Sequence, residues 1–181
     1  MNYIALLRGI NVGGNKTVDM KRLREVFESL GYTRVRTYIN SGNVFFSSLK
    51  TSSKILAELK DAFKVAFGFD VATLIKSGEQ IGSIAASIPE SWQNDDEQKT
   101  DVAYQFDEID NPGIISDLPM KSEFVRTIYT KGALIWNVDR KDYSKSNLNK
   151  LISHKYYKLM TVRNVNTARY LAKPRDTDQT N

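Results

Sequence analysis

Near its N-terminus the chain reads Tyr3-Ile4-Ala5-Leu6-Leu7-Arg8-Gly9-Ile10-Asn11-Val12-Gly13-Gly14-Asn15-Lys16, an apolar run that leads into a loop of glycines and asparagines. Residues 3–8 carry apolar side chains toward both faces of an extended chain, which predicts a strand at the centre of a sheet. Glycine has no Cβ, so the following loop can turn sharply and bring its N–H groups close to a ligand. Such a loop between a strand and a helix suits a phosphate, a carboxylate or a sugar-phosphate backbone.

The first 75 residues predict six elements in the order β-α-β-β-α-β, which is the ferredoxin-like split unit. Asp19 is expected to cap the first helix, and Gly31 is expected to end it. The second helix is expected to begin at Ser52 or Ser53 and to end at Gly68. The expected strands are residues 3–8, 34–39, 44–46 and 71–75, with a tight turn at residues 40–43.

A second group of elements is predicted beyond residue 76. A helix over residues 77–88 is expected to end at Pro89, and the polar, acidic residues 89–100 are typical of a linker. This half resembles the first in element order, without a repeated sequence motif. We therefore expect two subdomains, residues 1–90 with the connecting helix and residues 91–181 with a polar tail. The remaining expected strands are 101–106, 123–130 and 133–138, and the remaining expected helices are 143–157 and 163–173.

The glycine loop and the turn at residues 40–43 should lie at one edge of the first sheet. The first two strands of a split β-α-β unit run parallel, so both strands end at the same edge. The turn at residues 68–70, which enters the fourth strand, should lie there too. The loop matches no known nucleotide fingerprint, and the turn taken alone is equally typical of a plain hairpin. The candidate ligand-binding residues at this edge are Arg8, Gly9, Asn11, Gly13, Gly14, Asn15, Lys16, Ser41, Gly42 and Asn43.

A further polar cluster lies near the C-terminus, with the sequence Thr161-Val162-Arg163-Asn164-Val165-Asn166-Thr167. Arg163 offers a fork of donors for a carboxylate or phosphate, and Lys145 is a second candidate anion contact. The alternative is that the cluster is only a helix cap, formed by Thr161 or Asn164. The candidate binding residues in this half are Lys145, Arg163, Asn164 and Thr167.

These motifs together resemble the bacterial conserved family called domain of unknown function 1697. Residues 8–14 are similar to its N-terminal signature, and residues 38–45 are similar to its second motif. Ser144-Lys145 and Thr161-x-Arg163-Asn164-x-x-Thr167 resemble its C-terminal features, with Val165 where the family usually has an aromatic residue and Tyr170 where it usually has a lysine. The resemblance implies an α+β architecture of two ferredoxin-like subdomains and brings no established activity.

Composition excludes several kinds of chemistry. The chain has no cysteine, which rules out disulfides, thiolate nucleophiles and cysteine-based zinc sites. Its single histidine, His154, has no partner at metal-ligand spacing, so neither a metal nor a cofactor is expected. The N-terminus lacks the pattern of a signal peptide, and no apolar run approaches the ~20 residues that cross a bilayer. We expect a cytoplasmic protein without membrane contact.

The net charge of +5 favours anionic partners. The preferred hypothesis is the binding of a phosphate- or carboxylate-bearing small molecule at the loop edge, with no assignable reaction. The alternative is a single-stranded nucleic-acid-binding protein that uses the sheet face, as RNA-recognition modules do. The aromatic and basic residues for that alternative are Tyr3, Tyr38, Phe45, Phe46, Arg34 and Arg36. A third hypothesis is an oligomeric scaffold, for which one sequence supplies no test.

Overall fold

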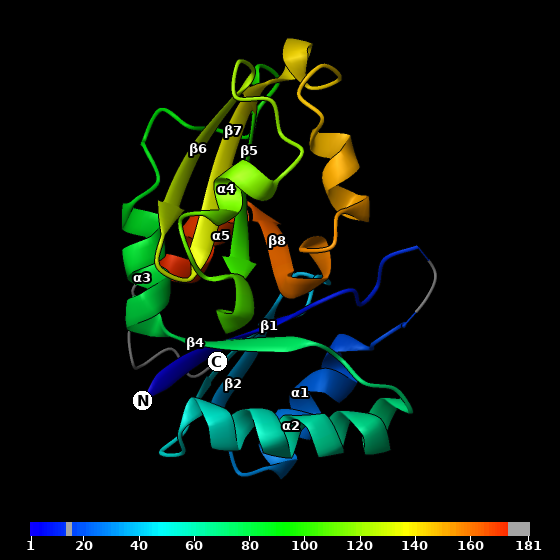
Figure 1. Ribbon diagram of the computed structural model, residues 1–181. Helices are drawn as coiled ribbons and strands as arrows, with labels where there is room; N and C mark the ends of the chain where they lie inside the picture. Colours follow the sequence, from blue (N-terminus) through cyan, green and yellow to red (C-terminus); the bar gives the residue numbers. More distant parts are fainter. Residues whose placement is uncertain (14–15, 174–181) are drawn as a thin grey trace. The chain divides into compact units, whose positions relative to one another are not determined.

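Two four-stranded antiparallel sheets form the framework of the protein (Figure 1). The computed structural model describes residues 1–13 and 16–173, and contacts divide the chain into the units Met1–Gly78 and Glu79–Asn181. The strand orders are β2-β3-β1-β4 and β6-β7-β5-β8. In each sheet the second, third, first and fourth strands of the unit follow one another across the sheet. Both units are ferredoxin-like, which confirms the predicted fold class. The predicted subdomain boundary at residue 90, with the connecting helix in the first half, stays a prediction.

The first unit follows the predicted order of elements closely. Asp19 caps its first helix, because the Asp19 side chain accepts a hydrogen bond from the Arg22 N–H at 2.7 Å. The second helix is capped by Thr51, one residue before the predicted serines, and ends at Gly68 with φ +79°. The elements are β1 (Asn2–Leu7), α1 (Met20–Ser29), β2 (Thr33–Tyr38), β3 (Asn43–Ser47), α2 (Ser52–Phe67) and β4 (Thr73–Ser77).

The core of the first unit lies between its sheet and the helices α1 and α2, which cover one face (Figure 1). Phe46 is at its centre, with ring centroids 5.0 Å from Tyr32, 5.1 Å from Phe27 and 5.7 Å from Tyr3. Aromatic pairs at such separations add about 0.5–1.5 kcal/mol each beyond the effect of area burial. The sheet is therefore fixed to its helices by a cluster of rings.

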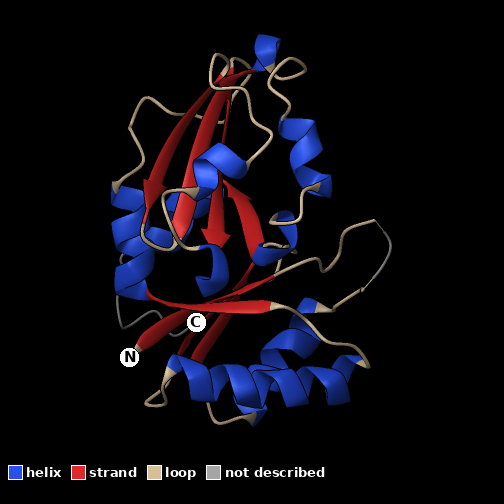
Figure 2. Cartoon of the chain, in the orientation of Figure 1, coloured by secondary structure: helices blue, strands red, loops and turns tan. Residues whose placement is uncertain are grey.

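The second unit has helices on both faces of its sheet (Figure 2). Ile114 of the short helix α4 packs in a core with Trp136, while the last helix α5 contacts β5 and β8. The helices and strands are α3 (Gly78–Ala86), β5 (Gln98–Gln105), α4 (Ile114–Asp117), β6 (Val125–Thr130), β7 (Ala133–Asp139), β8 (Met160–Asn164) and α5 (Val165–Ala172). Short 3-10 helices are η1 (Asp107–Ile109), η2 (Arg140–Asp142), η3 (Leu148–Ser153) and η4 (Tyr157–Leu159). Among the described residues, no helix is both long and apolar enough to cross a bilayer.

Two predictions for the second half were wrong. The expected helix over residues 143–157 is replaced by turns and 3-10 helices, because Asn147 adopts a left-handed conformation with φ +61° that an α-helix cannot contain. The expected helix over residues 163–173 begins only at Val165, because residues 160–164 form strand β8 and pair with β5. A five-residue edge strand depends on its sheet neighbour, which local sequence does not specify.

Candidate functional site

Three segments of the first unit meet where β1 ends. The Leu7 N–H donates to the Gly42 carbonyl at 2.8 Å, and the Arg8 N–H donates to the Ala72 carbonyl at 2.8 Å. The end of β1 therefore lies between the β2–β3 turn and the entry to β4, as the topology predicts. We call the described residues 8–13, 16–18, 39–43 and 70–72 the rim.

Asn11 fastens the glycine loop to the rest of the rim. Its amide Nδ2 donates to the carbonyls of Val18 and Asn40, each at 3.0 Å, and its Oδ1 accepts the Val18 N–H at 2.8 Å. The left-handed φ of +55° at this position is one that asparagine tolerates better than most residues. Asn11 is therefore a positioning residue, which holds the loop in shape.

The turn at residues 39–43 is also held from within. Asn43 is fully buried, and its Nδ2 donates to the Tyr38 carbonyl at 3.1 Å and to Ser41 Oγ at 2.9 Å. Gly42 has φ +75°, and a Cβ there would lie 2.7 Å from the Leu7 Cβ. Only glycine fits between the turn and β1 without displacement of one of them.

The backbone of the glycine loop alternates in handedness. The φ angle is positive at Gly9 (68°), Asn11 (55°) and Gly13 (64°), and it is not positive at the three residues 8, 10 and 12. Successive residues of opposite handedness turn neighbouring N–H groups toward one side and form a concavity that binds anions. Within residues 1–13 and 16–173, the backbone N–H groups of Gly9 and Ile10 have no hydrogen-bond acceptor.

Cations flank this loop. Arg8 is half-buried at its start, and Lys16 is exposed at its end. Lys16 Nζ donates to the Asp70 carbonyl at 3.1 Å and lies 5.6 Å from the centroid of the Phe69 ring. The predicted site residues Gly14 and Asn15 lie outside the described residues. The rim therefore joins a row of N–H groups to two positive side chains of one unit.

The candidate residues of the second unit have structural partners. Lys145 Nζ pairs with Asp142 Oδ1 at 3.0 Å and lies 5.8 Å from the centroid of the Phe124 ring. Asn164 caps α5, since its Oδ1 accepts the Thr167 N–H at 2.9 Å. The cap is therefore Asn164 and not Thr161, and a capping role accounts for the Asn164 and Thr167 positions.

Arg163 lies on β8 and is almost fully buried. Its Nη1 donates to Thr161 Oγ1 and to the Val162 carbonyl, both at 2.9 Å. Burial lowers the pKa of Arg163 to about 10, while the nearby Tyr104 acts in the opposite direction. Burial likewise raises the pKa of Tyr104 above its usual value, so the phenol is neutral and the guanidinium charged at neutral pH.

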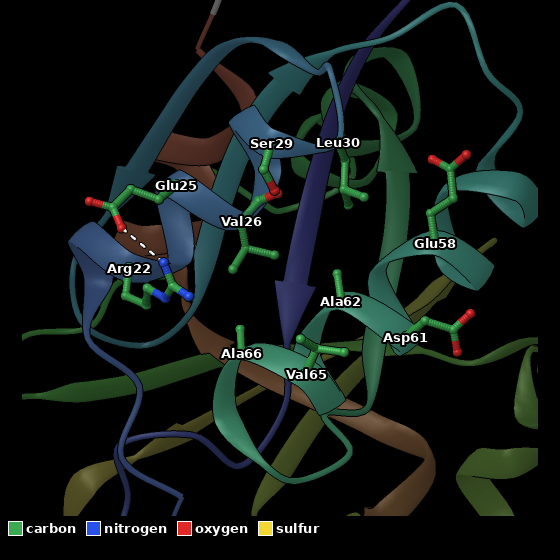
Figure 3. A pocket seen from close by; sticks show the side chains of 10 residues that line it. All are labelled: Arg22, Glu25, Val26, Ser29, Leu30, Glu58, Asp61, Ala62, Val65 and Ala66. Atoms are coloured by element: carbon green, nitrogen blue, oxygen red, sulfur yellow. Dashed lines mark hydrogen bonds and ion pairs between the residues drawn. The ribbon is translucent and has the colours of Figure 1, made fainter.

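Two features were missed by the sequence analysis. One is an open groove of about 520 Å³ between α1 and α2, which has an apolar floor and charged walls (Figure 3). The sequence signal that could have revealed this groove is Val65, an apolar residue on the solvent side of α2 with 89% of its surface exposed. The other is a set of buried polar atoms, Tyr104 OH, Gln105 Oε1 and Asn137 Oδ1, which lack hydrogen-bond partners among the described residues. Polar residues within apolar strand sequences were the signal for these.

Comparison with known proteins places the rim inside a recognised sequence family. The family model described as "Protein of unknown function (DUF1697)" matches residues 1–136. The chain belongs to the DUF1697 family. The DUF1697 match includes the whole rim, whereas Lys145, Arg163, Asn164 and Thr167 lie beyond its end.

Among the described residues, no group of three or more His, Asp and Glu side chains is placed to hold a metal ion.

A solved structure of similar architecture is the conserved bacterial protein SP0830 from Streptococcus pneumoniae. It is 28% identical to this DUF1697 chain, with a TM-score of 0.82. The alignment covers 94% of this chain and 96% of that one. No curated protein matches the chain. The likeness extends over both ferredoxin-like units and names no ligand or reaction.

Proposed function

We propose that the rim binds a small anion, such as the phosphate or carboxylate group of a metabolite. The observation that supports this is the alternation of φ at residues 8–13, together with the N–H groups of Gly9 and Ile10 that lack acceptors among the described residues. Backbone N–H groups are strong donors, and an anion satisfies several at once. A Cβ at Gly9 or Gly13 would meet nothing within 4 Å, so described neighbours leave this side of the backbone open.

The electrostatics of the rim favour the loop over the nearby helix end. The N-terminus of α1 is already capped by the carboxylate of Asp19 at 2.7 Å, and that carboxylate repels a second anion. Arg8 and Lys16 add positive charge at the two ends of the loop. These observations support binding of an anion and carry no assignment of a reaction.

A titration observed by ¹H–¹⁵N NMR tests the proposal directly. Inorganic phosphate is added first, followed by adenosine monophosphate, a sugar phosphate and citrate. We expect saturable shifts of the Gly9 and Ile10 amide signals with at least one of these anions. Shifts that grow without saturation, or that spread evenly over the chain, would show that the rim is not a binding site.

Charge variants separate a local site from general attraction. Arg8→Gln should weaken binding of the anion at least tenfold, since a charge-assisted hydrogen bond contributes about 1.5–3 kcal/mol. Arg36→Gln removes the same charge from an exposed position of β2 and is the matched control. Equal weakening by both variants would contradict the rim as the site.

The nucleic-acid alternative receives less support from the first sheet. Tyr3 and Phe46, two of its expected stacking residues, are buried under α1 and α2 in the aromatic cluster. Rings that are closed off by helices cannot stack on bases. Phe45, the cross-strand neighbour of Arg36, is buried as well, with 7% of its surface exposed. We therefore prefer the small anion for this unit.

A further inference from the structure

The net positive charge of the chain is carried by one segment of the second unit. Residues 140–158, which we call the basic crossover, link β7 to β8 and contain six cations and one acid, Asp142. That excess equals the formal net charge of +5, so the rest of the chain is balanced. The cations are Arg140, Lys141, Lys145, Lys150, Lys155 and Lys158.

The basic crossover is anchored by apolar residues and displays its polar ones. Leu148 and Leu151 are buried in the core of the second unit, and Tyr156 packs partly against that core. All six cations are exposed. In Figure 1 the segment runs in orange beside β8, where the first unit has the regular helix α2 in the equivalent connection. The crossover therefore forms a continuous outer flank of its unit.

Few carboxylates neutralise this flank. Lys145 pairs with Asp142, and Arg140 donates to the Asp95 carbonyl in an acidic loop at one end of the segment. Among the described residues, the side chains of Lys141, Lys150 and Lys158 have no ion-pair or hydrogen-bond partner. Two of these unpaired lysines, Lys150 and Lys158, lie in the stretch that contains η3 and η4.

Aromatic rings lie among these lysines. Lys155 Nζ is 4.8 Å from the centroid of the Tyr156 ring, and the His154 ring packs edge-on against Tyr156 at 5.2 Å. The Tyr156 hydroxyl donates to Asp117 at 3.3 Å, which fixes the ring. Lysines with interleaved rings are typical of proteins that follow the backbone of single-stranded nucleic acid.

We propose that the basic crossover binds single-stranded nucleic acid, chiefly through its phosphates. An anionic membrane is the less suitable partner, because Ile152 is the one large apolar side chain that the described crossover exposes, and an interfacial segment needs a row of them. This binding is independent of the anion at the rim, since it uses other residues of the other unit.

The test is fluorescence anisotropy of a labelled 20-nucleotide oligouridylate with the full chain, at sodium chloride concentrations from 50 to 200 mM. The triple variant Lys150→Gln, Lys155→Gln, Lys158→Gln removes three charges from the crossover. Its matched control is Lys21→Gln, Lys60→Gln, Lys64→Gln, three exposed lysines of α1 and α2. Circular dichroism establishes that both variants are folded.

We expect the crossover variant to bind at least tenfold more weakly at 100 mM salt, and the control to stay within about threefold of wild type. The slope of log K against log salt should fall by about 2 in the crossover variant, since each phosphate contact to a single strand contributes about 0.7. Equal losses in both variants would overturn the proposal, as would undetectable binding of the wild type at 50 mM salt. Binding to phosphatidylserine vesicles without binding to the oligonucleotide would also overturn it.

Discussion

Replacing Gly42 by alanine tests whether the rim depends on a close approach of the β2–β3 turn to β1. The new Cβ would lie 2.7 Å from the Leu7 Cβ and 2.8 Å from Ile10 Cδ1. The left-handed φ costs an alanine about 1–2 kcal/mol. Overpacking against a rigid strand costs about 1–3 kcal/mol more. We therefore expect Gly42→Ala to lower the free energy of unfolding by about 2–5 kcal/mol.

Gly68→Ala is the matched control for this experiment. Gly68 also has a left-handed φ, +79°, but a Cβ there would meet nothing within 4 Å. Gly68→Ala should therefore lower the free energy of unfolding only by the cost of the left-handed φ, about 1–2 kcal/mol. The loss of unfolded-chain entropy is similar for both replacements and cancels in the comparison.

Urea denaturation followed by circular dichroism measures the two variants on the full chain. Hydrogen exchange of the Leu7 amide, which donates to the Gly42 carbonyl, supplies a readout confined to the first unit. Both tryptophans, Trp92 and Trp136, lie in the second unit, so their fluorescence would report on the wrong part of the chain. Equal destabilisation by Gly42→Ala and Gly68→Ala would refute the close-approach argument.

Three further predictions concern side-chain networks. Asn11→Ala should lower the free energy of unfolding by about 1–3 kcal/mol and speed hydrogen exchange of the Val18 amide, because three hydrogen bonds of the rim are lost. An unchanged Val18 exchange rate would contradict this prediction. Arg169→Lys should lower the free energy of unfolding by about 2–4 kcal/mol, measured by urea titration of Trp92 fluorescence. Arg169 donates to three backbone carbonyls and one side-chain amide oxygen of residues 89–93 at 3.0–3.3 Å, and lysine lacks the planar fork of donors. Full stability of the lysine variant would refute the role of that fork. Hydrogen bonds from Lys50 and Tyr32 lower the pKa of Glu58, so the stability that they contribute is present above the ordinary pKa of 4.5 and is lost as pH falls through the lowered pKa. The urea midpoints of wild type and Glu58→Gln should therefore converge as pH falls through that lowered pKa, and a constant gap would show that the charge is irrelevant.

Local signals accounted for the first unit well. The helix boundaries of this unit depend on single residues. The Asp19 side chain caps the start of α1, and Gly31 and Gly68 end the two helices because they have no side chain to oppose a left-handed φ. Strong alternation and apolar runs located β1 to β4 within a few residues. The meeting of the glycine loop with the turn followed from topology alone, because a right-handed crossover leaves few arrangements.

The second unit was harder because its elements depend on neighbours. Strand β8 has five residues and is defined by pairing with β5, while the connection before it is held by Leu148 and Leu151 rather than by helical hydrogen bonds. A periodic pattern over residues 143–157 was compatible with an α-helix, and the left-handed Asn147 decided against it. No short window of sequence contains that information.

The order of elements in the first unit, the glycine-rich loop, the Asp19 cap of α1 and the concentration of positive charge in residues 140–158 were determined by the sequence itself. Tertiary structure alone decided that the Asn11 amide donates to the Asn40 carbonyl, and that Gly42 lies in close contact with Leu7. The physical reason is range. Backbone preference and charge belong to a residue and its immediate neighbours, whereas the partner of an amide or the space beside a Cα is set by chain segments some thirty positions away.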